Sequence, residues 1–540
     1  MCVDTLICWI YQMTFNTFPK LFQNAAQVAG DAKIYFTDEV ITYAELELET
    51  RRVARGLAKL GVGAGDRVGV WLPNLRAYLG LLGACGQLGA ILVSMNTRFR
   101  GAEIEDVLRR VKPKVVAFVT ELGRSNHIDI IEKIEPDLFS CVEALIQCGG
   151  RDLYKNKNVQ TLYYESLVTH GILEQPLCEP GSGCVIFNTS GTTSLPKFVL
   201  HNQQRVLAHA EDVARILEMN KMDTVILQSL PFCGVFGFVF LMAAVRAAAP
   251  CVMPEIFEAS DSARLIIDYK VSHAAGGDDM FSRLLEEGIR ITNDAQIPFP
   301  DLRVCPYASF NSALADFPTT AFKRGIPLVA PFGMSEVFSF FSLRKMEDAE
   351  NIRTIGGGFP VNINTKVRVR DPDTQEILGF EQEGELEMWS PNIFVEYFGD
   401  VKASMAAFTE DGFLRTGDLG TVSKNGSFTY LGRMGDVLRL GGFLVNPLEI
   451  ETHLCSHEMV EDAQVVSIAT DRGNKAVAFI LSNENIAFCE TTVIEYCRQS
   501  LAGFKVPIKI IPVDTFPTTP SPNGTKIQKS ALRELAVQSI

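Results

Sequence analysis

The chain has 540 residues, a length at which a single hydrophobic core gives way to several domains. Hydrophobic residues make up 47% and charged residues 21%, which is typical of a folded globular protein and excludes a disordered one. The net charge of −14 argues against a nucleic-acid partner, because phosphate contacts along a nucleic acid need clustered Lys and Arg.

Cysteines and histidines are scattered along the chain. The thirteen cysteines include no C-x-x-C pair, so they form neither a zinc-finger pattern nor a disulfide framework. Free thiols are typical of a reducing compartment, and the first 19 residues lack the Lys or Arg that begins a secretory signal. We therefore expect a cytoplasmic protein. The seven histidines are dispersed and predict no metal site.

Two apolar segments are candidates for a membrane span. Residues 77–97 are uncharged and long enough to cross a bilayer, but their glycines and the β-type run at 91–93 favour a buried helix leading into a buried strand. Residues 235–245 stop at Arg246 and are too short to span. We expect no transmembrane segment.

The first part of the chain alternates between helical and strand-like segments. Amphipathic stretches at 41–61 and 101–113 alternate with the short apolar runs 67–73 and 114–120. This alternation is typical of βαβ units and predicts a mostly parallel sheet.

The pattern changes twice towards the C-terminus. A second α/β half includes the apolar runs 225–232 and 327–333. Residues 360–432 instead contain short strands separated by D-P-D, S-P-N and N-G turns, which predict an antiparallel β unit. The remaining residues, roughly a hundred, alternate again between helix and strand and suffice for a small domain.

A loop rich in hydroxyl residues follows the apolar run 184–187. It reads TSGTT at 189–193 and ends in Pro196-Lys197. Successive backbone N–H groups of such a loop suit an anion, and Lys197 adds a positive charge. Taken alone, an ordinary turn is the commoner explanation of such a cluster.

Four further segments place polar residues where packing does not require them. PFGMSE (331–336) follows an apolar strand, and we expect it at a carboxyl end where α/β sheets bind ligands. The others are FLRTGDLG (413–420), GRMGDVLRLGGFLVNPLEIE (432–451) and SPNGTKIQKSALREL (521–535). Taken singly, each is explained by turn capping or by surface charge.

Together, in this order and over nearly the whole chain, these segments resemble the adenylate-forming superfamily of acyl-CoA synthetases, luciferases and peptide-synthetase adenylation domains. TSGTT with Pro196-Lys197 matches its phosphate loop, FGMSE resembles YGxTE, RTGD is unchanged, and NGTKIQK resembles the terminal GKIxK.

The resemblance implies an α/β fold. Its large N-terminal domain has two α/β sheet subdomains and a small antiparallel β subdomain, and a small mobile C-terminal α+β domain follows. We expect the ATP- and acid-binding domain at 1–434 and the mobile lid, which carries the catalytic lysine, at 435–540.

The resemblance also implies an AMP-forming acid–thiol ligase. A carboxylic acid attacks ATP to give an acyl-adenylate and pyrophosphate, and the thiol of coenzyme A then displaces AMP. The expected catalytic residues are Lys526, which bridges the carboxylate and the α-phosphate, Ser335, which binds the α-phosphate, and Glu336, which helps to hold Mg²⁺. Lys529 is a neighbour, but the match places the catalytic lysine before Ile527.

The implied nucleotide contacts are spread over the chain. Asp418 accepts the ribose hydroxyls with Arg433 beside it, and Phe332 stacks on adenine. The residues expected to bind ATP or coenzyme A are Thr189, Ser190, Gly191, Thr192, Thr193, Lys197, Ser309, Phe332, Gly333, Asp418, Arg433, Gly441 and Gly442.

The expected acyl pocket is apolar. Its candidate residues are Phe232, Gly234, Phe236, Phe238, Gly276, Phe310, Met334 and Phe338. They include no Lys or Arg to bind a second carboxylate, which favours a simple monocarboxylate of medium-chain, cyclic or aromatic type.

The chain departs from the family pattern at a few positions. Ser194 replaces a second glycine of the phosphate loop, Gly234 replaces a common histidine, and Gly435 stands at the domain pivot in place of Asp or Lys. Two alternatives to a CoA ligase stay open: acyl transfer to the phosphopantetheine thiol of a carrier protein, and a non-catalytic nucleotide-binding paralogue. The sequence leaves the oligomeric state open between monomer and homodimer.

Overall fold

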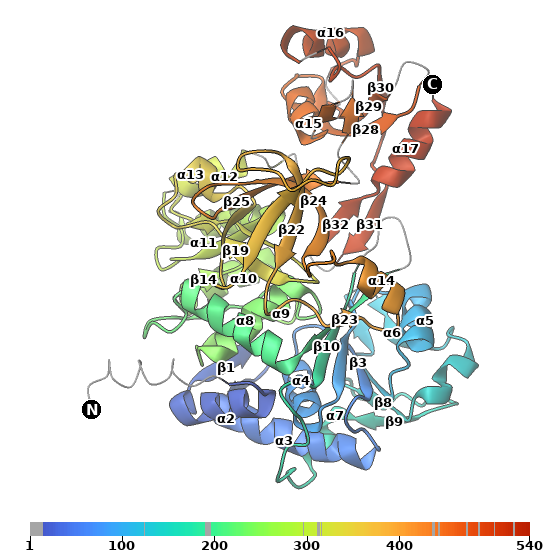
Figure 1. Cartoon of the computed structure of the whole chain (residues 1–540). Helices are drawn as coiled ribbons and strands as arrows, with labels where there is room; N and C mark the ends of the chain where they lie inside the picture. Colours follow the sequence, from blue (N-terminus) through green and yellow to red (C-terminus); the bar gives the residue numbers. More distant parts are fainter. Residues whose placement is uncertain are drawn as a thin grey trace.

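The computed structural model describes most of the chain. The described residues are 15–123, 125–189, 196–294, 296–309, 314, 316–434, 438–440, 443–445, 447–470, 474–483, 486–501, 503–521 and 524–539, with backbone alone for 439, 443, 444, 520, 521 and 524–526. A large body contains the first four fifths of the sequence, and a smaller C-terminal part lies at one end of it (Figure 1).

An eight-stranded mixed sheet forms the first α/β layer. Its order is β23 (Glu396–Tyr397), β11 (Phe198–Asn202), β10 (Gly183–Asn188), β4 (Ile91–Ser94), β3 (Arg67–Trp71), β5 (Val115–Phe118), β8 (Ala144–Gln147) and β9 (Gln160–Tyr163). The strands from β10 to β9 run parallel, whereas β11 and β23 are added antiparallel. The associated helices and short strands are α3 (Tyr43–Lys59), α4 (Arg76–Leu88), α5 (Gly101–Arg110), β6 (Glu121–Leu122), β7 (Ser125–Asn126), α6 (His127–Ile131), η1 (Pro136–Cys141) and α7 (Tyr164–Val168).

Helix α3 begins where the sequence provides a complete N-terminal cap. The Thr42 hydroxyl accepts the Glu45 N–H at 3.2 Å, and the Glu45 carboxylate accepts the Thr42 N–H at 2.8 Å. This capping box satisfies two of the backbone donors that a helix start leaves open.

The second α/β layer is assembled from distant segments. A five-stranded sheet has the order β14 (His273–Ala274), β12 (Ile226–Leu227), β13 (Cys251–Met253), β1 (Lys33–Phe36) and β2 (Val40–Thr42), and a three-stranded sheet follows with β15 (Gly276–Gly277), β16 (Cys305–Ala308) and β17 (Leu328–Val329). The helices of this part are α2 (Phe18–Ala29), α8 (Gln203–Ile216), α9 (Val235–Arg246), α10 (Ala259–Asp268), α11 (Asp278–Thr292) and α12 (Phe317–Lys323). Strand β1 thus completes a sheet whose other parallel strands follow it by some 200 residues, which ties the two layers together.

The third sheet is antiparallel and has seven strands. Its order is β18 (Pro331–Met334), β19 (Phe338–Leu343), β20 (Gly357–Pro360), β25 (Phe428–Arg433), β24 (Leu414–Val422), β22 (Gly384–Trp389) and β21 (Lys366–Arg370), with the short helices α13 (Glu350–Arg353) and α14 (Val401–Ala406) beside it. The antiparallel unit predicted at 360–432 is therefore confirmed, and it extends further towards the N-terminus than predicted, to β18.

The C-terminal part has its own small sheet and core. Its elements are β26 (Leu438–Leu440), β27 (Phe443–Val445), α15 (Pro447–Cys455), β28 (Val460–Ile468), β29 (Lys475–Ser482), α16 (Glu490–Ser500), β30 (Lys509–Pro512), β31 (Thr518–Ser521), β32 (Gly524–Ile527) and α17 (Lys529–Gln538). On one face of the sheet, Leu532 and Ala536 of α17 pack with Val466 and Phe479. Figure 1 places α15, α16 and α17 around this sheet, away from the N-terminal helices.

The two apolar segments are buried elements of the globular core. Every residue of α4 from Ala77 to Leu88 is buried, and α9 is buried from Phe236 to Arg246. Among the described helices, none combines the length and the apolar character needed to cross a membrane.

Candidate active site

The two ends of the phosphate loop are joined by hydrogen bonds. The Thr189 N–H donates to the Lys197 carbonyl at 2.9 Å, and the Lys197 N–H donates to the Thr189 hydroxyl at 3.2 Å. The Arg110 guanidinium donates a hydrogen bond to the carbonyl of the preceding residue, Pro196, at 2.8 Å. Residues 190–195 lie outside the described part of the chain, so the structure describes only the two hydrogen-bonded ends of this loop.

Ser335 and Glu336 lie in the turn between β18 and β19. This differs from the expected carboxyl end of a strand in an α/β sheet, because β18 pairs antiparallel with β19 and belongs to the third sheet. The turn is compact at Gly333, where a Cβ atom would lie 2.3 Å from the Phe338 carbonyl oxygen and 2.4 Å from the Ser339 Cα. Only glycine fits there without moving the backbone.

Two neutral histidines hold this turn from behind. The Nε2 atom of His201 bonds the Ser335 carbonyl and that of His209 bonds the Ser339 carbonyl, both at 2.7 Å. Since a carbonyl can only accept, each Nε2 carries the proton. Burial lowers the pKa of His201 to about 3 and that of His209 to about 4. Both rings stack on Phe338, at 3.9 and 4.9 Å between centroids.

Glu336 is a buried carboxylate with a defined partner. It is 6% exposed, and the Tyr397 hydroxyl donates to its Oε1 atom at 2.8 Å. The Phe394 N–H donates to the Glu336 carbonyl at 2.7 Å. The ammonium group of Lys197 lies 4.3 Å from the centre of the Tyr397 ring. The structure therefore connects the end of the phosphate loop to the Ser335–Glu336 turn through Tyr397.

Sequence reasoning missed Tyr397. It comes from β23, a strand of two residues whose apolar alternation is too short to detect. Its placement follows from antiparallel pairing with Val199 of β11, two residues beyond Lys197.

Asp418 and Arg433 face each other across neighbouring strands. They are directly paired in the register of β24 and β25, and Arg433 Nε lies 3.1 Å from Asp418 Oδ1. Asp418 is 2% exposed, and its N–H donates to the Thr416 hydroxyl at 3.0 Å. The Arg433 charge also acts on the Tyr397 hydroxyl, where it lowers a pKa that burial raises. The two expected ribose-binding residues thus form a pair whose arginine charge reaches the Tyr397 hydroxyl.

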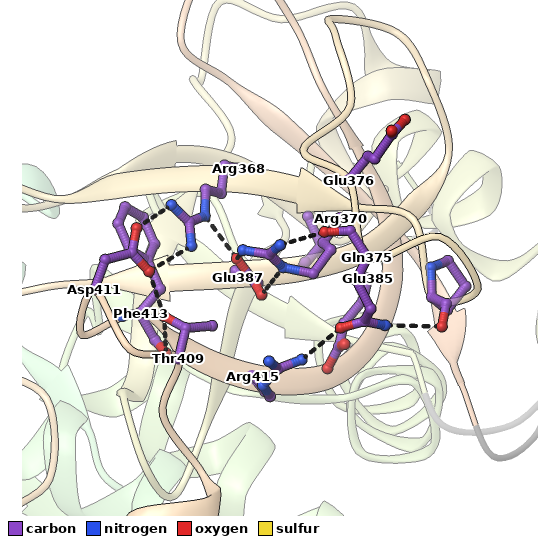
Figure 2. Close-up of polar contacts among 12 residues, drawn as sticks. Arg368, Arg370, Gln375, Glu376, Glu385, Glu387, Thr409, Asp411, Phe413 and Arg415 are labelled. Atoms are coloured by element: carbon purple, nitrogen blue, oxygen red, sulfur yellow. Dashed lines mark hydrogen bonds and ion pairs between the residues drawn. The ribbon is translucent and has the colours of Figure 1, made fainter.

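A charged network supports the strand that carries Asp418 (Figure 2). Glu387 is fully buried and accepts Arg368 at 2.6 Å and Arg370 at 2.5 Å. Arg368 also binds both oxygens of Asp411. Next to it, the Glu385 carboxylate accepts the N–H of Gly417 at 3.1 Å. The part of β24 just before Asp418 is therefore anchored to β22 through a side chain as well as through the sheet.

The two residues expected around adenine differ in burial, because Phe332 is buried and Ser309 is exposed. Phe332 is 8% exposed and packs edge-on against Phe428, with ring centroids 5.3 Å apart. Ser309 donates to the Asp278 carboxylate at 3.3 Å. Adenine stacking on Phe332 stays a prediction.

Several of the expected acyl-pocket residues contact other aromatic side chains. Phe238 of α9 contacts Phe187 at 5.1 Å, and Phe236 contacts Phe340 at 5.2 Å. Phe338 is fully buried between the histidines described above, and Phe232 is 1% exposed against Tyr78. Gly234 starts α9, Gly276 lies in β15 beside Met280 and Phe281, and Met334 is half-buried at the end of β18.

Several expected site residues lie outside the described part of the structure. These are Ser190, Gly191, Thr192, Thr193, Phe310, Gly441, Gly442 and the side chain of Lys526. Lys529 is described: its ammonium group bonds the buried Glu451 carboxylate and the Val465 carbonyl. These contacts hold Lys529 in the C-terminal core, and the catalytic role of Lys526 stays a prediction.

The chemistry of this donor set fits Mg²⁺ bound with a nucleotide. Mg²⁺ in such sites takes one or two carboxylates and completes its coordination with phosphate oxygens and water. Glu336 supplies one buried carboxylate near Lys197. Among the described residues, no group of three or more His, Cys, Asp or Glu side chains has the arrangement of a metal site.

Comparison with known proteins assigns the chain to a family. The model of the AMP-binding enzyme family matches residues 21–398, and that of the AMP-binding enzyme C-terminal domain matches residues 449–522. The long-chain-fatty-acid–CoA ligase FadD13 of Mycobacterium tuberculosis is 28% identical over 92% of this chain and 93% of that protein. The mitochondrial medium-chain acyl-CoA ligase ACSF2 of Rattus norvegicus is 25% identical over 93% of this chain and 84% of its own.

Solved structures share the fold. The anthranilate CoA ligase AuaEII, in complex with anthranoyl-AMP, superposes with a TM-score of 0.81 at 21% identity, covering 98% of this chain and 99% of that one. The fold class expected from the sequence is thereby confirmed. The family model matches well over half of the chain, and the chain therefore belongs to the AMP-binding enzyme family.

Proposed function

We propose that this protein is an AMP-forming acid–CoA ligase. It activates a carboxylic acid with ATP as an acyl-adenylate, releases pyrophosphate, and transfers the acyl group to coenzyme A. The observation that carries the proposal is the group formed by Lys197, Glu336 and Tyr397, together with the ion pair of Asp418 and Arg433. Three separate segments thus meet around the place where the resemblance puts the nucleotide.

Different side chains of the site bind different parts of the nucleotide. Thr189 and Lys197 flank the loop that binds the β- and γ-phosphates, and Ser335 binds the α-phosphate. Asp418 accepts the two ribose hydroxyls. Glu336 would hold Mg²⁺, which neutralises charge on the phosphate oxygens when bound. Catalysis is then positioning and electrostatic stabilisation of the charge that builds on phosphorus.

Lys526 supplies the charge that is specific to the first half-reaction. It bridges the attacking carboxylate and the α-phosphate while negative charge develops between them. We place the domain boundary at 434/435 and Lys526 in the lid. In the second half-reaction the lid turns, and Gly441 and Gly442 approach the pantetheine arm of coenzyme A, where only small side chains fit.

The acid is a simple monocarboxylate of medium-chain, cyclic or aromatic type. The aromatic neighbours of Phe236 and Phe238 are apolar, which supports this choice. The names of the relatives span long-chain and medium-chain fatty acids, so they support the class of reaction more than one acid. The eleven described cysteines are free thiols, which supports a cytoplasmic location.

The test is a pyrophosphate-release screen over a panel of acids, with AMP and ADP resolved by chromatography. We expect AMP and pyrophosphate in equal amounts, and a thioester when coenzyme A is present. A thioester formed only on a phosphopantetheinyl carrier protein would select the carrier-loading alternative. Stoichiometric ADP, or nucleotide binding without turnover of any acid, would refute the ligase assignment.

A further inference from the structure

Tyr397 makes two contacts that join distant segments of the proposed site. Its hydroxyl donates to Glu336 Oε1 at 2.8 Å, and its ring faces the Lys197 ammonium group at 4.3 Å. The ring is a π-face for a cation, and the hydroxyl is a donor for an anion. A single side chain therefore serves both of the charged groups expected to meet the phosphates and the metal.

The position of Tyr397 is set by its surroundings. Its backbone pairs with Val199, and its N–H donates to the Ser404 hydroxyl at 2.9 Å. Arg205 donates to the carbonyls of Ile393 and Phe394, both at 2.8 Å, and so holds the preceding segment. Tyr397 is 4% exposed. Because the ring is buried and its backbone is anchored at these points, Tyr397 has little freedom to move. Its contacts therefore orient Glu336 and Lys197, and not the reverse.

The hydroxyl is the donor in its contact with Glu336. A carboxylate oxygen accepts hydrogen bonds, so the Tyr397 O–H donates to Glu336 Oε1. A donor fixed on one carboxylate oxygen sets the rotation of the carboxylate and hence the direction of its second oxygen.

We propose that Tyr397 is a positioning residue for magnesium–ATP, which orients Glu336 through its hydroxyl and Lys197 through its ring. Oppositely charged groups that contact the same side chain attract each other, and pairing between them would remove both from the phosphates. The tyrosine gives each group a neutral partner instead. The inference rests on the proposed function, because it takes Glu336 as the magnesium ligand and Lys197 as a phosphate ligand.

The two contacts can be separated by substitution. Tyr397→Phe keeps the ring that faces Lys197 and removes the donor to Glu336. Outer partners of metal ligands typically contribute about 10- to 100-fold to metal affinity or activity. We expect Tyr397→Phe to raise the Mg²⁺ concentration for half-maximal rate about 10-fold or more, with a smaller change in kcat at saturating Mg²⁺. Tyr397→Leu removes both contacts and should in addition raise the KM for ATP.

The chain offers a matched control. The Tyr164 hydroxyl donates to another buried carboxylate, Glu49 Oε1, at 2.5 Å, between α7 and α3. Tyr164→Phe therefore deletes the same kind of hydrogen bond at a place with no predicted site residue. It should change the thermal midpoint in the same direction as Tyr397→Phe and leave the Mg²⁺ dependence at the wild-type value.

A double-mutant cycle tests whether Tyr397 acts through Glu336. In a Glu336→Gln background, Tyr397→Phe should change the Mg²⁺ dependence by less than about 2-fold, since the group it orients is already altered. An equal loss in both backgrounds would overturn the proposal, as would an unchanged Mg²⁺ dependence of Tyr397→Phe in the otherwise wild-type protein.

Calorimetric titration of magnesium–ATP into wild type and Tyr397→Phe gives a readout that does not depend on turnover. If no acid in the panel is activated by wild type, the proposed function fails, yet this titration still tests Tyr397. Weaker binding by Tyr397→Phe, relative to Tyr164→Phe, supports the positioning role. Equal binding by the two variants contradicts it, even in an active enzyme.

Discussion

At the scale of single residues, the site contains charged groups that are buried and that interact with a partner. Asp418 is 2% exposed and lies 3.1 Å from the Arg433 guanidinium, an arrangement that needs a reason because burying a charge is costly. Accepting two ribose hydroxyls supplies that reason in the proposed ligase.

Asp418→Ala should weaken ATP binding. Both ribose hydroxyls lose their acceptor inside a buried site, at about 1–3 kcal/mol for each. A calorimetric titration with ATP measures the effect. Asp223→Ala is the control, because Asp223 also pairs with an arginine, Arg303, but its side chain is 73% exposed. ATP affinity equal to that of the wild type would exclude Asp418 from the ribose site.

His209→Gln should flatten the dependence of stability on pH below neutrality. Burial lowers the pKa of His209 from 6.5 to about 4, so the unfolded chain takes up a proton in this interval that the folded chain does not. Its contribution to stability is complete above pH 6.5 and is lost as the pH falls towards 4. Glutamine keeps a donor for the Ser339 carbonyl but cannot titrate.

The measurement is the free energy of unfolding at several pH values. The slope for the variant should be smaller by about 1.4 kcal/mol per pH unit in this window, which corresponds to one proton. Equal slopes in the two proteins would show that His209 is not neutral in the folded state.

At the scale of elements, the β18–β19 hairpin carries the residues expected at the α-phosphate and the metal. The turn is held by His201 at Ser335 and by the Phe394 N–H at Glu336, and His209 bonds the carbonyl of Ser339 in β19. Phe338 and Phe340 have φ angles of +66° and +59°, which are strained for aromatic side chains. Strain of this kind persists where the surroundings hold the backbone firmly.

Gly333→Ala should displace this hairpin. The new methyl group would meet backbone atoms of Phe338 and Ser339 at 2.3 and 2.4 Å, and backbone cannot rotate aside as a side chain can. We expect a loss of about 1–3 kcal/mol in stability together with a lower kcat/KM. Gly171→Ala is the control, since the methyl group added there would meet no atom within 4 Å beyond its chain neighbours. A fully active Gly333→Ala enzyme would contradict the tight turn.

The network around Glu387 makes a second prediction for an element. Glu387→Ala leaves Arg368 and Arg370 without their buried partner and should cost about 3–5 kcal/mol in stability. Asp411→Ala removes a carboxylate that is 57% exposed from the same arginine and should cost much less, because water screens an exposed ion pair. Thermal or denaturant unfolding compares the two, and similar losses would show that burial of Glu387 is not the deciding factor.

At the scale of the whole molecule, the proposed cycle needs two placements of the C-terminal part. Lys526→Ala should lose acyl-adenylate formation from ATP but still convert supplied acyl-adenylate and coenzyme A into thioester. Gly442→Trp should do the reverse, because a bulky ring blocks the pantetheine path and leaves the phosphates undisturbed. Separate assays of the two half-reactions measure this. Loss of the same half-reaction in both variants would show that one fixed placement suffices.

Much of the architecture could be predicted from the sequence, because helix and strand periodicity and turn composition are local properties. The helix at 41–61, the strand at 67–73 and the buried character of 77–97 are observed as α3, β3 and α4–β4. The antiparallel unit was also recognisable from its short strands and turns, whereas Asp418, which the flanking glycines predicted in a turn, lies inside strand β24 because it pairs with Arg433 of β25. The run 225–232 forms only the short strand Ile226–Leu227, because the residues after it turn into the start of α9.

The sequence alone determined the order of the phosphate loop, Ser335–Glu336, Asp418 and Lys526, since each is a short motif whose chemistry lies within a few residues. Only the tertiary structure decided how the described motifs meet. It placed Glu336 in an antiparallel hairpin, and it brought Tyr397 between Lys197 and Glu336. Both results depend on pairing between strands far apart in the chain, where contact energy comes from packing and register and leaves no local pattern.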